Sequence, residues 1–244
     1  MKKLILCGLL ISPWLYADNI SLSLMGGFIT SSLKNEPLVE INNFVTNAYI
    51  TNKNNHWGEF WGGSLAHSFE EIIPHVNFSL GVAGYAIQPG EVKGTVFPFI
   101  NEGVFDSLNY KFQVKNNSLM IESGLSYGLG NWRPFIIAGI GKSWNRLENY
   151  NEVPSDPASS ATALPSFRNN IHQAHAYELG LGCSYLFYED TRHKIRYMTS
   201  AGYRFWNLGK GELETFAEQT SNSRLHSNNI KTQGLAVSLD VSFY

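Results

Sequence analysis

The sequence predicts an all-β protein: an antiparallel, up-and-down transmembrane β-barrel of about eight strands that follows an N-terminal signal peptide. Three observations support this prediction. Eight stretches alternate between apolar and polar residues with a period of two. The segments that join these stretches alternate between short and long. The composition combines 14% aromatic residues and 22 glycines with only 16% charged residues, against about 25% in typical soluble proteins, which indicates strands with a lipid-facing side.

The chain begins with a pattern typical of exported proteins. Lys2 and Lys3 precede an apolar run over residues 4–11, and Pro13 and Ala17 follow. These are the three parts of a secretory signal peptide. The run is too short for a membrane helix, which needs about 20 residues. We therefore predict a signal peptide over residues 1–17 and an outer-membrane β-barrel domain over residues 18–244.

Charge and cysteine content exclude several classes of function. Loss of Lys2 and Lys3 with the signal peptide takes the formal net charge from −2 to −4, so the chain has no basic footprint for nucleic acid. Cys183 is then the one cysteine left, which excludes an internal disulfide. No glycine-rich phosphate loop or His-Glu-x-x-His motif is present. We expect no cofactor, no metal site and no enzymatic activity.

Each of the eight stretches has one apolar, aromatic face and one face of Gly, Ser and Ala with isolated charges. Over residues 175–187, for example, Tyr177, Leu181 and Tyr185 alternate with Glu178 and Gly180. The small face suits a narrow lumen, and the apolar face suits lipid. The predicted strands are residues 20–31, 57–69, 76–88, 119–129, 135–147, 175–187, 195–206 and 235–243.

The connections differ in length in the way expected of an outer-membrane barrel, with short periplasmic turns and long external loops. The short connections are residues 70–75, 130–134 and 189–194, and the long ones are residues 32–56, 89–106, 148–172 and 209–229. A ten-stranded barrel that uses residues 38–50 remains an alternative. Aromatic residues at the strand ends predict girdles at the two interfaces: Tyr127, Trp132, Tyr185, Phe187 and Tyr197 near the short turns, and Trp57, Trp61, Phe205 and Trp206 near the long loops.

One hairpin places charged residues inside the lumen. If its turn is centred on residues 190–192, Glu178 faces Arg204 across the two strands on the inward side. Glu122 is also inward, and Arg196 lies on the same face nearer the periplasm. Buried charges must be paired. We predict a structural charge network of Glu122, Glu178, Arg196 and Arg204 that plugs the barrel.

The segment before residue 119 has the opposite alternation. Tyr110, Phe112 and Val114 have even numbers, whereas Leu119 and Ile121 have odd numbers. A β-bulge over residues 115–117 would bring both sets onto one face, and we predict one there.

These features resemble the small eight-stranded outer-membrane barrels, the family of the OmpA transmembrane domain and the opacity-type surface proteins. The resemblance is carried by the strand pattern, by residues 118–122, by Gly139-Ile140-Gly141 after Pro134-Phe135, and by the aromatic C-terminus. It implies a barrel in the bacterial outer membrane, among lipid and lipopolysaccharide, that is inserted by the barrel-assembly machinery. Phe243 and Tyr244 would form the assembly signal, although the alternation turns Phe243 outward rather than the last residue. External loops would then serve a structural, adhesion or host-contact role with an external or host ligand.

Two alternative functions make other demands on the sequence. An outer-membrane lipid A-modifying hydrolase would need a histidine within reach of a serine. His67 and Ser68 point to opposite faces, His226 and Ser227 lie in a predicted loop, and His172 and His175 are on opposite faces of one strand. A small channel or porin-like protein would need an open lumen, which eight strands do not leave.

Overall fold

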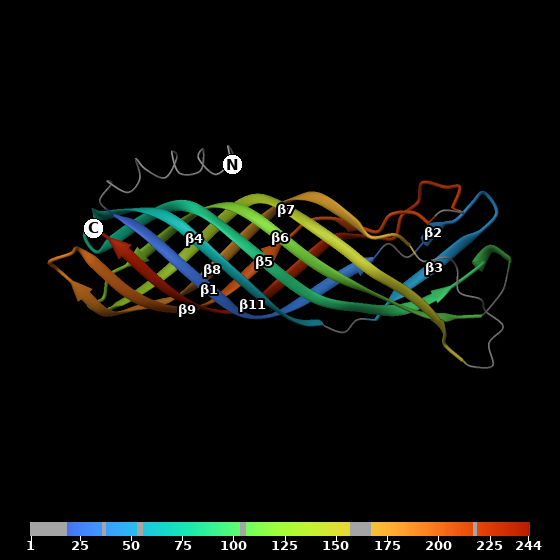
Figure 1. Cartoon of the computed structure of the whole chain (residues 1–244), viewed down its shortest axis with the longest axis horizontal. Helices are drawn as coiled ribbons and strands as arrows, with labels where there is room; N and C mark the ends of the chain where they lie inside the picture. The colour runs from blue at the N-terminus through green and yellow to red at the C-terminus, as the bar shows by residue number, and fades with distance from the viewer. Residues whose placement is uncertain (1–18, 36–37, 53–55, 103–105, 157–166, 217–218) are drawn as a thin grey trace, which may run out of the picture.

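The computed structural model describes residues 19–35, 38–52, 56–102, 106–156, 167–216 and 219–244. The predicted signal peptide lies outside these residues. Eight long strands form one closed antiparallel ring (Figure 1), because β1 pairs with both β4 and the last strand, β11. The predicted up-and-down barrel is confirmed. Its strands are β1 (Ile20–Asn35), β4 (His56–Ile73), β5 (Val76–Phe97), β6 (Leu108–Tyr127), β7 (Trp132–Pro154), β8 (Asn170–Asp190), β9 (Ile195–Asn207) and β11 (His226–Phe243).

Three short strands and one helical turn lie at the end of the barrel away from the C-terminus (Figure 1). β2 (Leu38–Glu40) and β3 (Thr46–Thr51) form a hairpin, and β3 pairs with the far end of β5, with Ala48 opposite Phe97. The ten-stranded alternative is therefore wrong, because residues 38–50 extend the sheet at this end and add no strand to the ring. The other two elements are the 3-10 turn η2 (Ile100–Glu102) and β10 (Gly211–Glu212), which pairs with β11.

The strands are longer than the sequence pattern predicts. Much of two predicted loops, residues 89–106 and 148–172, is strand: β5 continues to Phe97 and β7 to Pro154. The prediction stopped early because the apolar side of the strands changes face in these segments. The strands themselves continue.

β6 shows how this change happens without a bulge. Every even residue from Leu108 to Met120 is buried, and every odd residue from 109 to 121 is exposed. Asn117 pairs regularly with Ala86 on one side and Trp144 on the other. The bulge predicted at residues 115–117 is therefore wrong. The inward face stays the same, and the surroundings of the outward face change from lipid to water.

Two rings of outward residues mark the limits of the lipid-facing belt. The lower ring, at the short turns, is apolar and consists of Ile20, Phe69, Phe78, Tyr127, Trp132, Tyr185, Tyr197 and Phe243. Ten residues further along each strand, the outward residue is polar: Thr30, Glu59, Gln88, Asn117, Lys142, His175, Asn207 and Gln233. Ten residues at about 3.3 Å each, on strands tilted about 40°, span roughly 25 Å, which is the height of the apolar band of outer-membrane barrels.

The belt between these rings suits lipid. All of its outward positions lie in the described part of the chain, and none of them is Asp, Glu, Lys or Arg. The aliphatic hydroxyls of the outward residues Ser123 on β6 and Thr199 on β9 donate hydrogen bonds to neighbouring backbone carbonyls at 3.4 and 3.2 Å. Polar groups in hydrocarbon must be satisfied within the protein. The described residues form no helix long and apolar enough to cross a membrane.

Candidate functional site

The lumen contains a network of four polar side chains from four strands. The guanidinium of Arg204 on β9 contacts the Glu178 carboxylate on β8 and lies 3.8 Å from that of Glu122 on β6. It also donates a hydrogen bond to the Tyr85 hydroxyl on β5, which in turn donates to Glu122. The side chains of Arg204, Glu178 and Glu122 are 11%, 0% and 13% exposed. The structure thus brings together three of the four predicted network residues.

The register of the β8–β9 hairpin differs from the predicted one by two residues. Glu178 lies opposite Trp206, and Arg204 lies opposite Gly180. The turn is centred later than predicted, with Asp190 opposite Ile195, and the register then shifts between Leu186 and Tyr188; the symmetric prediction left out both. The ion pair forms nevertheless, because diagonal neighbours on one face are within reach of long side chains.

Tyr85 was missing from the prediction, although the sequence contains its signal. It has the odd parity of the inward face of β5 and is 3% exposed. A large polar side chain among inward Gly, Ser and Ala residues needs a partner, and the Glu122 carboxylate supplies it.

Arg196 does not belong to this network, so that part of the prediction is wrong. Its Nε donates to Glu189 Oε1 at 2.8 Å, and its guanidinium lies 3.8 Å from the centre of the Tyr244 ring. Both contacts are at the periplasmic end of β9, where Phe243 pairs with Ile195. Phe243 is 41% exposed on the outside, while Tyr244 lines the mouth of the lumen. The role of Phe243 and Tyr244 as an assembly signal stays a prediction.

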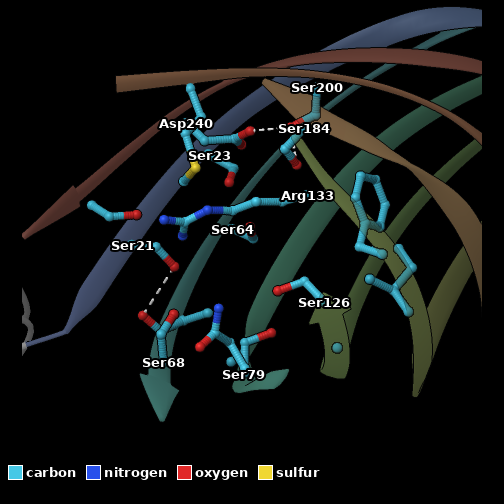
Figure 2. Close-up of a pocket in the computed structure, with 18 of the residues that line it drawn as sticks. Ser21, Ser23, Ser64, Ser68, Ser79, Ser126, Arg133, Ser184, Ser200 and Asp240 are labelled. Carbon is cyan, nitrogen blue, oxygen red and sulfur yellow. Dashed lines mark hydrogen bonds between the residues drawn. The ribbon is translucent and has the colours of Figure 1, made fainter. Parts of the chain in front are cut away.

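Below the network, the periplasmic half of the lumen is a cavity of about 190 Å³ (Figure 2). Its wall is built from inward serines, with Arg133 among them, and its carboxylate Asp240 accepts hydrogen bonds from Ser200 and, at 3.1 Å, from Ser238. A polar cavity of this size is large enough for several waters. The labelled hydroxyl groups come from Ser21, Ser23, Ser64, Ser68, Ser79, Ser126, Ser184 and Ser200.

Above the network, the lumen is filled by an apolar core. Trp206 is fully buried, with ring centroids of Phe60 and Tyr85 at 4.8 and 5.7 Å. The rings of Tyr110 and Phe112 stack further out, at 6.2 Å. The predicted position of Trp206 in the outer girdle is therefore wrong, because its even number places it on the inward face of β9.

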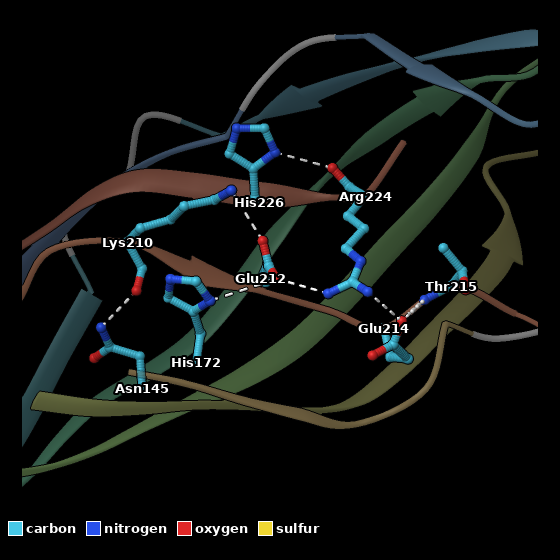
Figure 3. Close-up of polar contacts among 8 residues, drawn as sticks. All are labelled: Asn145, His172, Lys210, Glu212, Glu214, Thr215, Arg224 and His226. Atoms are coloured by element: carbon cyan, nitrogen blue, oxygen red, sulfur yellow. Dashed lines mark hydrogen bonds and ion pairs between the residues drawn. The ribbon is translucent and has the colours of Figure 1, made fainter. Parts of the chain in front are cut away.

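The outer mouth is closed by residues 208–216 and 219–225, which fold back over the core. Leu208, Leu213 and Leu225 are fully buried. A charged cluster on β10 holds this segment (Figure 3): Glu212 meets Arg224 at 2.7 Å and Lys210 at 2.9 Å. Burial acts to raise the pKa of Glu212, but hydrogen bonds from Lys210 and Arg224 outweigh it and hold the pKa below its usual value.

His67 and Ser68 lie on opposite faces as predicted, and so do His172 and His175. The prediction that His226 and Ser227 lie in a loop is wrong, because they are the first two residues of β11. Ser68 lines the lumen cavity, whereas His67 is on the outside against the ring of Phe69 at 4.6 Å. His172 points inward to Glu212, at 3.4 Å, and His175 points outward to Lys142, at 3.2 Å. Within the described ranges, no three His, Cys, Asp or Glu residues lie close enough to hold a metal ion.

Comparisons with known proteins find a likeness in structure and none in sequence. No family model matches the chain, and no curated protein matches it. Among solved structures, Neisserial surface protein A is similar with a TM-score of 0.48 and 11% identity over 92% of this chain and 97% of that one. Ail of Yersinia pestis gives 0.36 and 11%, over 91% and 99%. The N-terminal β-barrel domain of Pseudomonas aeruginosa OprF gives 0.34 and 12%, over 92% and 99%.

The geometry of the chain itself establishes its class. A closed ring of eight antiparallel strands leaves no unpaired edge in the membrane, and its belt is apolar between a lower ring of mostly aromatic residues and a polar ring. The chain is a small outer-membrane β-barrel.

Proposed function

We propose that the protein is a surface protein of the outer membrane whose external end contacts a ligand outside the cell, in an adhesion or host-contact role. The barrel would be inserted by the barrel-assembly machinery and would serve as the anchor. The observation that carries the proposal is the continuation of the barrel beyond the lipid belt.

This continuation forms a rigid platform. β5 runs nine residues past its polar-ring residue, from Gln88 to Phe97, and β6 has nine residues before Asn117, from Leu108. Nine residues of tilted strand rise about 20 Å above the lipid. The segment has an aromatic core of its own, so its loops are held far from the membrane on a packed support rather than on flexible linkers.

The tip of this platform exposes apolar side chains that the barrel does not need. Leu38, Phe44 and Ile50 in the β2–β3 hairpin are 53%, 79% and 55% exposed. Exposed aromatic and aliphatic groups within a polar surface are typical of protein-binding sites. We propose that this hairpin is part of the contact surface.

The lumen supports a structural rather than a transport role. The Arg204 network and the core around Trp206 fill the tube above the serine-lined cavity. An eight-stranded lumen is normally filled by side chains, and Arg204 inside this one pairs with Glu178 and Glu122.

The test is adherence of bacteria that display the full chain. We expect cells with the wild-type protein to bind epithelial cell layers more than cells without it. The double variant Phe44→Ser/Ile50→Ser should lose most of that gain, at equal surface display and with the same faster migration of the unboiled barrel on SDS gels. Val153→Ser is the matched control, since Val153 is exposed on the side of the platform. Adherence that is the same with and without the protein, or equal in both variants, would contradict the proposal.

A further inference from the structure

The polar ring carries a basic pair on one side of the barrel. Lys142 on β7 and His175 on β8 lie directly opposite each other across the strands and both point outward. Their Nζ and Nε2 atoms are 3.2 Å apart on an exposed surface. In the described part of the chain, neither side chain meets a carboxylate. An ammonium group has three donors, so Lys142 keeps two for another acceptor.

Two further cations lie above this pair on the same face. Lys115 on β6 is directly opposite Arg146 on β7, and both contact Glu148, at 2.6 and 3.3 Å. Lys115, Lys142 and Arg146 therefore bring three permanent positive charges against one carboxylate. The remaining ring positions hold one charged residue, Glu59, on the other side of the barrel. We call Lys115, Lys142, Arg146 and His175 the basic patch.

The height of the basic patch identifies its ligand. Lys142 is ten residues from Trp132 in the lower aromatic ring, so it lies where the apolar belt of about 25 Å ends. Leu119, next to Lys142, and Ile140, one outward position below it, belong to the belt. Phosphate groups of membrane lipids lie at this level, directly above their acyl chains.

The surface beneath the patch also fits lipid. The row of outward residues that leads from Lys142 passes Leu119 and then Gly84 and Gly63. A side chain added at Gly84 would meet nothing closer than a backbone oxygen at 3.9 Å, so this position leaves open space between Leu119 and Leu24 at the belt surface. An acyl chain can lie there while its headgroup reaches the cations.

We propose that the basic patch binds the phosphate groups of a phosphorylated glycolipid of the outer leaflet. The proposal deepens the surface-protein function, on whose membrane placement it rests. A free phosphate ion would be attracted only by exposed charges, and salt screens that attraction. A lipid is attracted by the same charges and also buries its acyl chains against the apolar surface below them. Each Lys or Arg near a membrane surface contributes about fivefold in affinity.

The experiment measures lipid binding to the folded full-length barrel in nonionic detergent by native mass spectrometry. The probes are bisphosphoryl lipid A and the same lipid with both phosphates removed. The variant Lys142→Gln/Arg146→Gln should bind bisphosphoryl lipid A about 25-fold more weakly than wild type. For the phosphate-free lipid, the variant and the wild type should have the same weak affinity. The control Lys93→Gln/Lys111→Gln removes the same charge from the platform exterior, where both lysines lie near Glu91, and should change the affinity less than twofold.

Three results would overturn the proposal. An equal loss in the control would show general attraction between charges. Equal affinity of wild type for the phosphate-free lipid would show that acyl chains alone bind. If inorganic pyrophosphate displaced bisphosphoryl lipid A at the same concentration at which it binds the barrel in the absence of lipid, the ligand would be identified as a free phosphate. The adherence test uses other residues, so the two proposals can fail separately.

Discussion

Removal of the Arg204 side chain tests whether the lumen network holds the barrel together. In Arg204→Met, the methionine replaces most of the volume, but Glu178 and Glu122 keep two carboxylates in the lumen without their guanidinium partner. Because Glu178 is fully buried, water does not replace that partner. Loss of one member of a buried ion pair costs about 3–5 kcal/mol, which is a large part of a typical stability of about 5–15 kcal/mol.

The comparison with a multiple variant separates pairing from packing. In Arg204→Met/Glu178→Gln/Glu122→Gln, no unpaired charge is left, so we expect the triple variant to be more stable than Arg204→Met alone. A matched control lies on the same strand: Arg196 also pairs with a glutamate, Glu189, but at the rim, and Arg196→Met should cost less than about 1 kcal/mol.

The assay is urea unfolding of the barrel in lipid vesicles, followed by tryptophan fluorescence and by the mobility difference between boiled and unboiled samples. If Arg204→Met unfolded at the same urea concentration as wild type, or if the triple variant were less stable than the single one, the network would not be a structural plug. A loss for Arg196→Met as large as that for Arg204→Met would show that burial does not decide the effect.

Three further predictions follow from the structure. Trp206→Ala should destabilise the barrel by about 3–5 kcal/mol, measured by the same unfolding assay, because it leaves a cavity in the core above the network. Spin labels at positions 119 and 113, which share the outward face of β6, should report acyl chains and water respectively; the same surroundings at both would contradict the belt boundary. In the β8–β9 turn, hydrogen bonding between the two side chains raises the pKa of His193 above 6.5 and lowers the pKa of Asp190 below 3.8. The contribution of His193 to stability is lost as pH rises through its folded pKa, and that of Asp190 is lost as pH falls through its own folded pKa. The pair therefore stabilises the turn between these two values, and Asp190→Asn should lower the His193 pKa in an NMR titration.

The sequence pattern was sufficient to predict the strands within the lipid-facing belt, but it was misleading for the part of the barrel beyond the belt. Alternation reports which residues share a face, and this was correct for all eight strands. It does not report which face is inward. On β6, Phe112 and Leu119 are both apolar, but one packs in the core and the other faces lipid. A rule that places all apolar residues on one face requires a bulge between them, and the structure has none there.

The lumen network shows a similar limit. Inward parity located Glu122, Glu178 and Arg204, since charges on a face of small residues stand out. Pairing register was less certain. The turn is centred later than predicted, with Asp190 opposite Ile195, and one irregularity lies near Phe187; together they move the later pairs by two residues without changing the face. Arg196 is on the same inward face of β9 as Arg204, but it lies at the periplasmic end of the strand and pairs with Glu189 instead. Parity selects a face, whereas depth along the strand selects the partners.

The two changes of polarity occur at different depths, and this difference explains the position of the network. On the outside, apolar residues give way to polar ones ten residues above the lower ring. On the inside, hydroxyl groups give way to aromatic residues earlier: Arg204, Glu178 and Tyr85 are each seven residues from their lower-ring residues Tyr197, Tyr185 and Phe78. The network therefore lies within the membrane, between the serine-lined cavity and the aromatic core. Glu122 and Arg204 line the cavity below, while Trp206 covers the network from above. A conducting path would need the ion pairs to separate and the core to open together, which is why we expect no stable conductance from this barrel in planar bilayers.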